Sequence, residues 1–342
     1  MRYDLIILLV LSALGAQGCR RAEAPGYLLL VIGAVIELLA DSITMMAAGG
    51  LMVASGIALR GGRQNASARV AFGALFLFSI GASVVAAFTR ADMLEEVRFT
   101  LGGVPPTVAR GALVTVWMAL VLRLVILPAL LAQSMPVPAV VAIGPAWWSA
   151  SVLTVRWGGV LPQDAVETCG ALCAPFAVVI VVAAGVWAFR EGPWSGVIGA
   201  TCAGVGALVA FGGWFGGASA VSGGRVLLGS TAVAGCSLAA AGSHSVASAT
   251  VTQAIRLLLL GFPLGAGFSG RISLIKGVGG LDSFLGVAAL AWWLLPLIGW
   301  IRHASPVPAE GRPRWLVWVA LAAGLWGALE GGPLSPGQLL PW

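Results

Sequence analysis

Three charged residues lie inside segments that are otherwise apolar enough to cross a membrane. Glu37 lies in Val31–Leu39 (VIGAVIELL), and Arg123 follows seven apolar residues in Val116–Pro128. Arg271 follows a stretch rich in glycine and proline in a third such segment. A charge at membrane depth is costly, usually faces the bundle interior, and marks an ion or proton pathway. The candidate chemistry is therefore the holding or moving of charge within a membrane.

Two further charges lie near these residues. Asp41 follows Glu37 by four residues, so both carboxylates would share one face of a continuous helix. We expect Glu37 near the middle of a span over 26–48, whereas for Asp41 a buried role and a place at the headgroup level are equally open. Lys276 follows Arg271 by five residues, which turns it well away from the face of Arg271. We favour a Lys276 side chain that extends to the interface, and its place in the ion pathway stays open.

The sequence offers no enzyme site of its own. We find no His-Asp-Ser set, no metal-binding cluster and no phosphate-binding loop outside the apolar segments. Cys169 and Cys173 share a helix face, but neither histidine is near them in sequence, so we interpret them as small buried hydrophobic residues. No catalytic residue, metal or cofactor is therefore expected in this chain.

The composition is that of a polytopic membrane protein. Of the 342 residues 59% are hydrophobic and 9% are charged, against about 25% charged in a soluble domain. Fourteen Trp against two Tyr fit the anchoring of spans at membrane interfaces. The net charge of +6 comes from scattered basic residues, which excludes a nucleic-acid-binding surface and leaves lipid as the expected surroundings.

Apolar runs of about 20 residues recur along the whole chain and predict an all-α membrane helix bundle of about eleven spans. The loops between them are short, and Arg90–Arg98 is expected to be one of them. We expect one membrane domain over 1–342, with a first repeat-like half at 1–157, a shortened second half at 171–302, and a C-terminal helix and tail at 314–342. The expected spans are 3–19, 26–48 (with a continuation to 59 left open), 67–89, 109–132, 137–157, 171–189, 195–215, 223–242, 249–277, 281–302 and 314–330.

Two of these helices should be interrupted. Pro128 lacks a backbone donor and should kink or end its helix, and Pro136 and Pro138 follow closely. The second interruption contains Gly261, Pro263 and Gly267. Interrupted helices in two separate halves indicate a transporter built from inverted repeats. The alternative is a pair of ordinary tight loops, which is weak for the second interruption because its flanking halves are each too short to span.

These features together resemble the antiporter-like membrane subunits of complex I, the proton-pumping NADH–quinone oxidoreductase, and most closely its subunit N. The family's Gly-x-Pro-Pro-x-x-Gly-Phe-x-x-Lys motif is similar to Gly261, Pro263, Gly267 and Phe268, with Arg271 at the lysine. Further similarities follow in chain order. Ile36–Leu39 resembles the family's Leu-Glu-Leu-Leu motif, and Asp92–Val97 resembles its acidic loop. Arg123–Pro128, together with Pro136–Pro138, resembles its lysine-bearing broken helix. Gly224–Thr231 resembles its Lys-Arg-Leu-Leu-Ala-Tyr-Ser-Ser segment.

The chain departs from the family at the residues that titrate. The lysine central to the family's proton path falls on Trp148, a second lysine falls on Gly224, and a histidine falls on Ala234. Arginine stays protonated where a buried lysine can release its proton, so Arg123 and Arg271 are better interpreted as fixed charges that keep carboxylates such as Glu37 ionised. The chain resembles a shortened, partly degenerate member of the family.

Three functional hypotheses follow from the resemblance and the buried charges. The first is a membrane-arm subunit of a complex I-like energy-converting complex that contributes to proton or cation translocation. The second is a structural or docking subunit that has lost conduction, and the third is an independent secondary transporter or an unrelated polytopic membrane enzyme. The resemblance implies other membrane and peripheral subunits as partners, a redox reaction belonging only to the whole complex, and the bacterial inner membrane as the location.

Overall fold

The computed structural model describes a bundle of α-helices. Within the described residues no β-strand occurs, so the predicted all-α class is confirmed. Those residues are 2–17, 19, 21–61, 66–134, 144–160, 163–190, 204, 206–211, 266–280 and 282–302. The helices are α1 (Arg2–Gln17), α2 (Ala24–Leu39), α3 (Ile43–Gly61), α4 (Ala66–Thr89), α5 (Leu94–Thr100), α6 (Pro106–Val121), α7 (Leu127–Ser134), α9 (Gly144–Gly158), α10 (Gln163–Arg190), α14 (Ala266–Gly279) and α15 (Ser283–Arg302).

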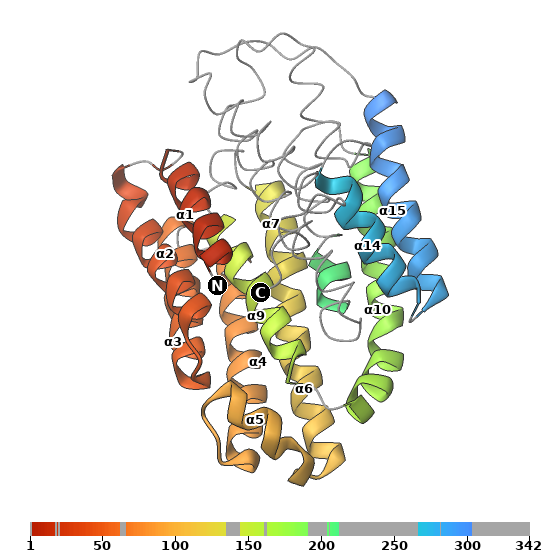
Figure 1. Ribbon diagram of the computed structural model, residues 1–342. Helices are drawn as coiled ribbons and strands as arrows, with labels where there is room; N and C mark the ends of the chain where they lie inside the picture. The colour runs from red at the N-terminus through yellow and green to blue at the C-terminus, as the bar shows by residue number, and fades with distance from the viewer. Residues whose placement is uncertain are drawn as a thin grey trace.

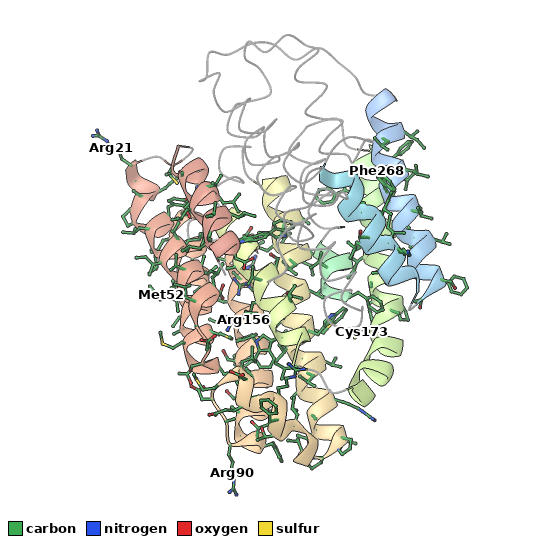
Figure 2. The ribbon with its side chains drawn as sticks, viewed as in Figure 1. Arg21, Met52, Arg90, Arg156, Cys173 and Phe268 are labelled. Atoms are coloured by element: carbon green, nitrogen blue, oxygen red, sulfur yellow. The ribbon has the colours of Figure 1, made fainter. Side chains whose placement is uncertain are left out.

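Four described helical segments are long and apolar enough to cross a bilayer. They are Arg21–Leu39, Ile43–Arg60, Ala66–Thr89 and Pro106–Leu130. Arg21 and Arg90 point away from opposite ends of the bundle, as expected of charged residues that flank spans (Figure 2). The total of about eleven spans stays a prediction, because 223–242 and 314–330 lie outside the described residues and 195–215 lies there largely.

The predicted span over 26–48 is wrong, because the chain turns back between α2 and α3. Ser42 lies at the start of α3 and accepts a hydrogen bond from the backbone N–H of Met45, 3.4 Å away. An antiparallel bridge joins Ser42 to Met93. A continuous helix to residue 59 would be about 50 Å long at 1.5 Å per residue, far more than the bilayer core of about 30 Å. Asp41 therefore lies in a turn and shares no helix face with Glu37.

Asp92, from the turn after α4, caps the N-terminus of α3. Its Oδ1 accepts hydrogen bonds from the backbone N–H and the hydroxyl of Thr44 at 3.0 and 2.9 Å, and its Oδ2 accepts one from the hydroxyl of Ser42. The Ser42 hydrogen bond is the main reason that the pKa of Asp92 lies below its ordinary value of 3.8; desolvation raises this pKa, and the two hydrogen bonds from Thr44 lower it further. The ionised form of Asp92 therefore stabilises this corner of the bundle.

We expect this stabilisation to depend on pH. Because the pKa of Asp92 is lower in the folded state, the contribution is complete above pH 3.8 and is lost as the pH falls through the folded value. Asp92→Asn should lower Tm near neutral pH, and its curve of Tm against pH should converge with that of wild type in acid. Glu95→Gln, at an exposed position on α5, is the control. Parallel curves for Asp92→Asn and wild type would contradict the assignment.

The expected loop at Arg90–Arg98 is wrong from Leu94 onward, where α5 begins and continues to Thr100. Leu94, Val97 and Leu101 are buried, and their spacing places them on one helical face. The segment is too short and too charged to be recognised as a span from sequence. Its buried face can be identified only when the helices that cover it are known.

Pro128 does not end its helix. The backbone passes from α6 through a π-helical turn, η3 (Leu122–Ile126), directly into α7, and Pro128 is the second residue of α7. The backbone N–H of Leu127 donates to the carbonyl of Leu122, a five-residue spacing. The wider turn just before the proline absorbs the distortion that would otherwise break the helix. Pro136 and Pro138 lie outside the described residues.

Helix α9 lies in the interior of the bundle (Figure 1). All residues from 144 to 154 are buried, polar residues included. Helices α1 and α2 pack against it, and α6 lies close by, while α10, α14 and α15 form a second packed group. A helix buried on every side holds its side chains away from lipid, so polar groups on α9 can be satisfied only by protein.

Candidate functional site

Glu37 and Arg123 form an ion pair in the interior of the bundle. Arg123 Nη1 lies 2.5 Å from Glu37 Oε1, and Arg123 Nη2 lies 2.9 Å from Glu37 Oε2. The planar guanidinium thus binds both carboxylate oxygens, the arrangement that makes an arginine–carboxylate pair strong and geometrically specific. Ser149 on α9 donates its hydroxyl to Glu37 Oε2 at 2.8 Å. The predicted buried charges of α2 and η3 are therefore brought together.

The pair is shielded from solvent and lipid. Glu37 is 1% exposed and Arg123 is 8% exposed. Removing two charges from water is costly, and a pair in a low-dielectric interior is stable only with good geometry and further hydrogen bonds. The two-fold contact and the Ser149 hydroxyl supply both. Arginine keeps its charge at every physiological pH, so Arg123 supplies a fixed positive partner to the Glu37 carboxylate as long as the pair is closed.

Glycines on α3 form a wall of the carboxylate site. A Cβ on Gly49 would lie 2.8 Å from Glu37 Cγ, and a Cβ on Gly50 would lie 3.1 Å from Glu37 Oε1. The backbone of α3 therefore lies so close to Glu37 that a side chain at Gly49 or Gly50 would displace the Glu37 side chain. Gly33 on α2 meets the same part of α3, since its Cβ would lie 2.6 Å from the carbonyl oxygen of Gly49.

A second ion pair lies at the C-terminal end of α2. Arg156 Nη2 is 2.5 Å from Asp41 Oδ1, and Arg156 Nη1 donates to the carbonyl oxygens of Ala40 and Leu38 at 2.5 and 3.3 Å. A cation at this position compensates the unpaired carbonyls and the negative end of the helix dipole. Asp41 is mostly exposed, at 67% of its side chain. It is thus a partner of the helix end and no part of the buried carboxylate cluster.

Ser149 and Arg156 are functional candidates that the sequence alone did not reveal. They are seven residues apart on α9, so they lie on one face, and both contact the last turns of α2. The sequence signalled this face only by serine and threonine residues within an apolar run that ends at Arg156, and such residues are common in ordinary membrane helices. Their role became visible once α9 was placed against α2.

Arg271 lies in a different part of the bundle. It is 2% exposed on α14, and its guanidinium carbon lies 5.0 Å from the centre of the Trp292 ring on α15. The flat face of an aromatic ring attracts a cation at this distance. A Cβ on Gly204 would lie 2.0 Å from Trp292 Nε1, so the lack of a side chain at this position lets the backbone approach the indole closely. Arg271 is therefore buried, as the sequence predicted, and the contact that the structure describes for its guanidinium is with the aromatic ring of Trp292.

The remaining predicted residues divide between described and undescribed parts of the chain. Lys276 is exposed, in keeping with the side chain turned away from Arg271. Gly267 lies inside α14, which begins at Ala266, so its predicted place in a helix interruption is wrong. The ring of Phe268 packs edge-on against Trp293, 5.4 Å between centres (Figure 2 labels Phe268). Gly261 and Pro263 lie outside the described residues.

Trp148, the residue on which the resemblance places the family's central lysine, is an uncharged indole in the interior of the bundle. The indole is 1% exposed, and its Nε1 donates to the backbone carbonyl of Asp4 on α1 at 3.0 Å. It thus joins α9 to α1 and leaves no titratable group at that position. Within the described residues no cluster of three His, Cys, Asp or Glu side chains could bind a metal ion.

Solved structures of membrane complexes share this fold. A chain of the membrane-bound sulfane sulfur reductase, an archaeal respiratory membrane complex, superposes with a TM-score of 0.79 at 16% identity, covering 96% of this chain and 78% of the other. A chain of respiratory complex I from Thermus thermophilus gives 0.74 at 15% identity, covering 98% and 82%. The fold is that of an antiporter-like membrane subunit. A chain of the Mrp complex from Dietzia sp. DQ12-45-1b gives 0.70 at 14% identity, covering 96% and 79%.

No protein-family model and no curated protein matches the chain in sequence. At identities of 14–16% the shared property is the fold, and a fold alone does not determine function. The chain is an integral membrane protein with this fold, and its specific role has to be argued from its own buried residues.

Proposed function

We propose that this chain is a membrane subunit of a complex I-like energy-converting complex and contributes to proton or cation translocation through its buried charges. The observation that carries the proposal is the Glu37–Arg123 pair, closed by two contacts of 2.5 and 2.9 Å in a bundle of this fold. Buried ion pairs within spans are costly and are kept mainly where charge is held or moved. Other subunits of such a complex and lipid are the proposed partners.

The pair acts through its opening and closing. While it is closed, Arg123 stabilises the charge on Glu37, and when it opens, Glu37 becomes an uncompensated buried carboxylate that attracts a proton or cation. Arg123 keeps its own charge throughout. In this proposal Glu37 is the group that exchanges charge, whereas Arg123 and Arg271 are fixed cations. Any redox reaction belongs to other subunits, and this chain supplies neither a cofactor nor a catalytic residue.

A specific observation favours the second candidate function, that of a structural subunit without conduction. Glu37 Oε2 accepts hydrogen bonds from both Arg123 and Ser149, so the carboxylate is well satisfied as it stands. Trp148 leaves the next step of a proton path without a titratable side chain. A saturated ion pair stabilises a particular packing of helices as readily as it moves charge.

Glu37→Gln in the complex purified in mild detergent separates the two candidates. If the pair moves charge, ion translocation into liposomes should fall to background, while electron transfer and subunit composition stay intact. Unchanged translocation in a fully assembled complex would favour the structural role. Glu95→Gln on the exposed face of α5 is the matched control, since it also removes one carboxylate. A chain that purifies alone and transports ions in liposomes would instead indicate an independent transporter.

A further inference from the structure

Pro128 leaves a carbonyl oxygen in the π-helical turn before it without its usual helical donor. In an α-helix the carbonyl of Leu124 would accept the N–H of residue 128, and proline has none. A buried carbonyl that loses its hydrogen bond costs about 1–3 kcal/mol. Leu124 is fully buried, so this carbonyl needs a donor from elsewhere in the protein.

Trp147 on α9 supplies that donor. Its Nε1 lies 2.9 Å from the carbonyl oxygen of Leu124, and the indole is 5% exposed. From another direction Gly206 closes the site, because a Cβ there would lie 2.6 Å from the same oxygen. The carbonyl is thus enclosed between an indole N–H and a glycine, both placed by other helical segments.

We propose that Trp147 is a positioning residue that holds the π-helical turn and thereby directs Arg123 at Glu37. Arg123 precedes Leu124 by one residue in the same turn, so the orientation of the Leu124 peptide sets the direction of the Arg123 side chain. Adding or removing a π-turn rotates the following residues around the helix axis by roughly a full residue step of about 100°. Arg123 lies within this turn, so loss of the π-helical geometry would change the direction of its side chain relative to the carboxylate. The inference rests on the proposed role of the Glu37–Arg123 pair.

The neighbouring Trp148 provides a matched comparison. Both indoles are buried on α9, and both donate to a backbone carbonyl, at 2.9 Å for Trp147 and 3.0 Å for Trp148. The acceptor of Trp147 lies in the turn that carries Arg123, whereas the acceptor of Trp148 is Asp4 on α1. Replacing either by phenylalanine removes one donor and a similar volume, but only Trp147→Phe should disturb the ion pair.

The test uses the full chain in its purified membrane complex and two readouts that do not depend on transport. The first is the infrared carboxylate band of Glu37, assigned by its disappearance in Glu37→Gln. Trp147→Phe should shift this band, and Trp148→Phe should leave it in place. The second is Tm measured in wild-type and Glu37→Gln backgrounds. Trp147→Phe should lower Tm by a few degrees in wild type and by clearly less in Glu37→Gln, because the pair it supports is already absent.

An unshifted band, or an equal loss of Tm in both backgrounds, would overturn the inference, since Trp147 would then stabilise the bundle without acting on the pair. If Trp147→Phe does not accumulate, Gly206→Ala presses on the same carbonyl and should shift the same band. Failure of the proposed function is recognised separately. In that case Glu37→Gln would leave ion translocation unchanged, while the band shift in Trp147→Phe would still be observed.

Discussion

Arg123→Ala should destabilise the protein more than any other truncation at the site. The variant leaves the Glu37 carboxylate 1% exposed and without its cation, and removing one partner of a buried pair costs about 3–5 kcal/mol. We expect a fall of several degrees in Tm of the purified complex, or loss of the chain from the membrane. Thermal unfolding followed by the fluorescence of the buried tryptophans measures the effect.

Three variants show whether the loss comes from the unpaired carboxylate. Arg123→Lys keeps the cation but loses the two-fold contact, so its Tm should lie between those of wild type and Arg123→Ala. The double variant Glu37→Leu with Arg123→Leu removes both charges and should recover much of the stability. Arg98→Ala, at an exposed position, should have little effect. A double variant as unstable as Arg123→Ala would mean that packing, and not charge, causes the loss.

Gly33→Ala should have the second largest effect, through the contact between α2 and α3. The new Cβ would lie 2.6 Å from the carbonyl oxygen of Gly49 and 2.8 Å from the backbone nitrogen of Val53. Both are backbone atoms, so the overlap can be relieved only by moving one helix away from the other. Overpacking of this kind costs about 1–3 kcal/mol. We expect a lower Tm together with weakened ion translocation, because the same displacement moves Glu37 relative to Arg123.

Gly73→Ala on α4 is the matched control for this prediction. A Cβ at Gly73 meets no atom within 4 Å, and alanine is the better helix former, so Tm should stay the same or rise slightly. Equal losses for Gly33→Ala and Gly73→Ala would show that glycine flexibility, and not close helix approach, is what matters at these positions.

The sequence predicted the class of the protein and the residues with the highest electrostatic cost. The all-α class, the helix over 66–89 and the helix ending at Arg302 follow from hydropathy, which a local window of sequence records fully. Glu37, Arg123 and Arg271 were recognised because a charge in an apolar run stands out without knowledge of its partner. The resemblance to antiporter-like subunits rested on one specific motif at Gly261–Arg271 and on the order of several weak ones, and the fold agrees with it.

The wrong predictions concern helix ends, at places where the local sequence does not show whether a helix stops or continues. Residues 26–59 are almost uniformly apolar, so the turn at Ala40–Ser42 left little trace in hydropathy, although Asp41 and Ser42 are typical turn and capping residues. Pro128 predicts a break wherever a regular α-helix is assumed, and the π-helical turn avoided it. In both cases a contact from a distant segment, Asp92 at α3 and Trp147 at Leu124, made the observed backbone favourable.

By itself the sequence determined that this chain spans a membrane and that it buries Glu37, Arg123 and Arg271 there, because residue type and hydropathy set the cost of each position. Only the tertiary structure decided that Glu37 meets Arg123, 86 residues away, while Asp41 turns out to Arg156 and Arg271 lies against Trp292. Which charged side chains form an ion pair depends on how the helices pack and on which donor binds each free backbone carbonyl. Those interactions join residues far apart in the chain, and no local pattern records them.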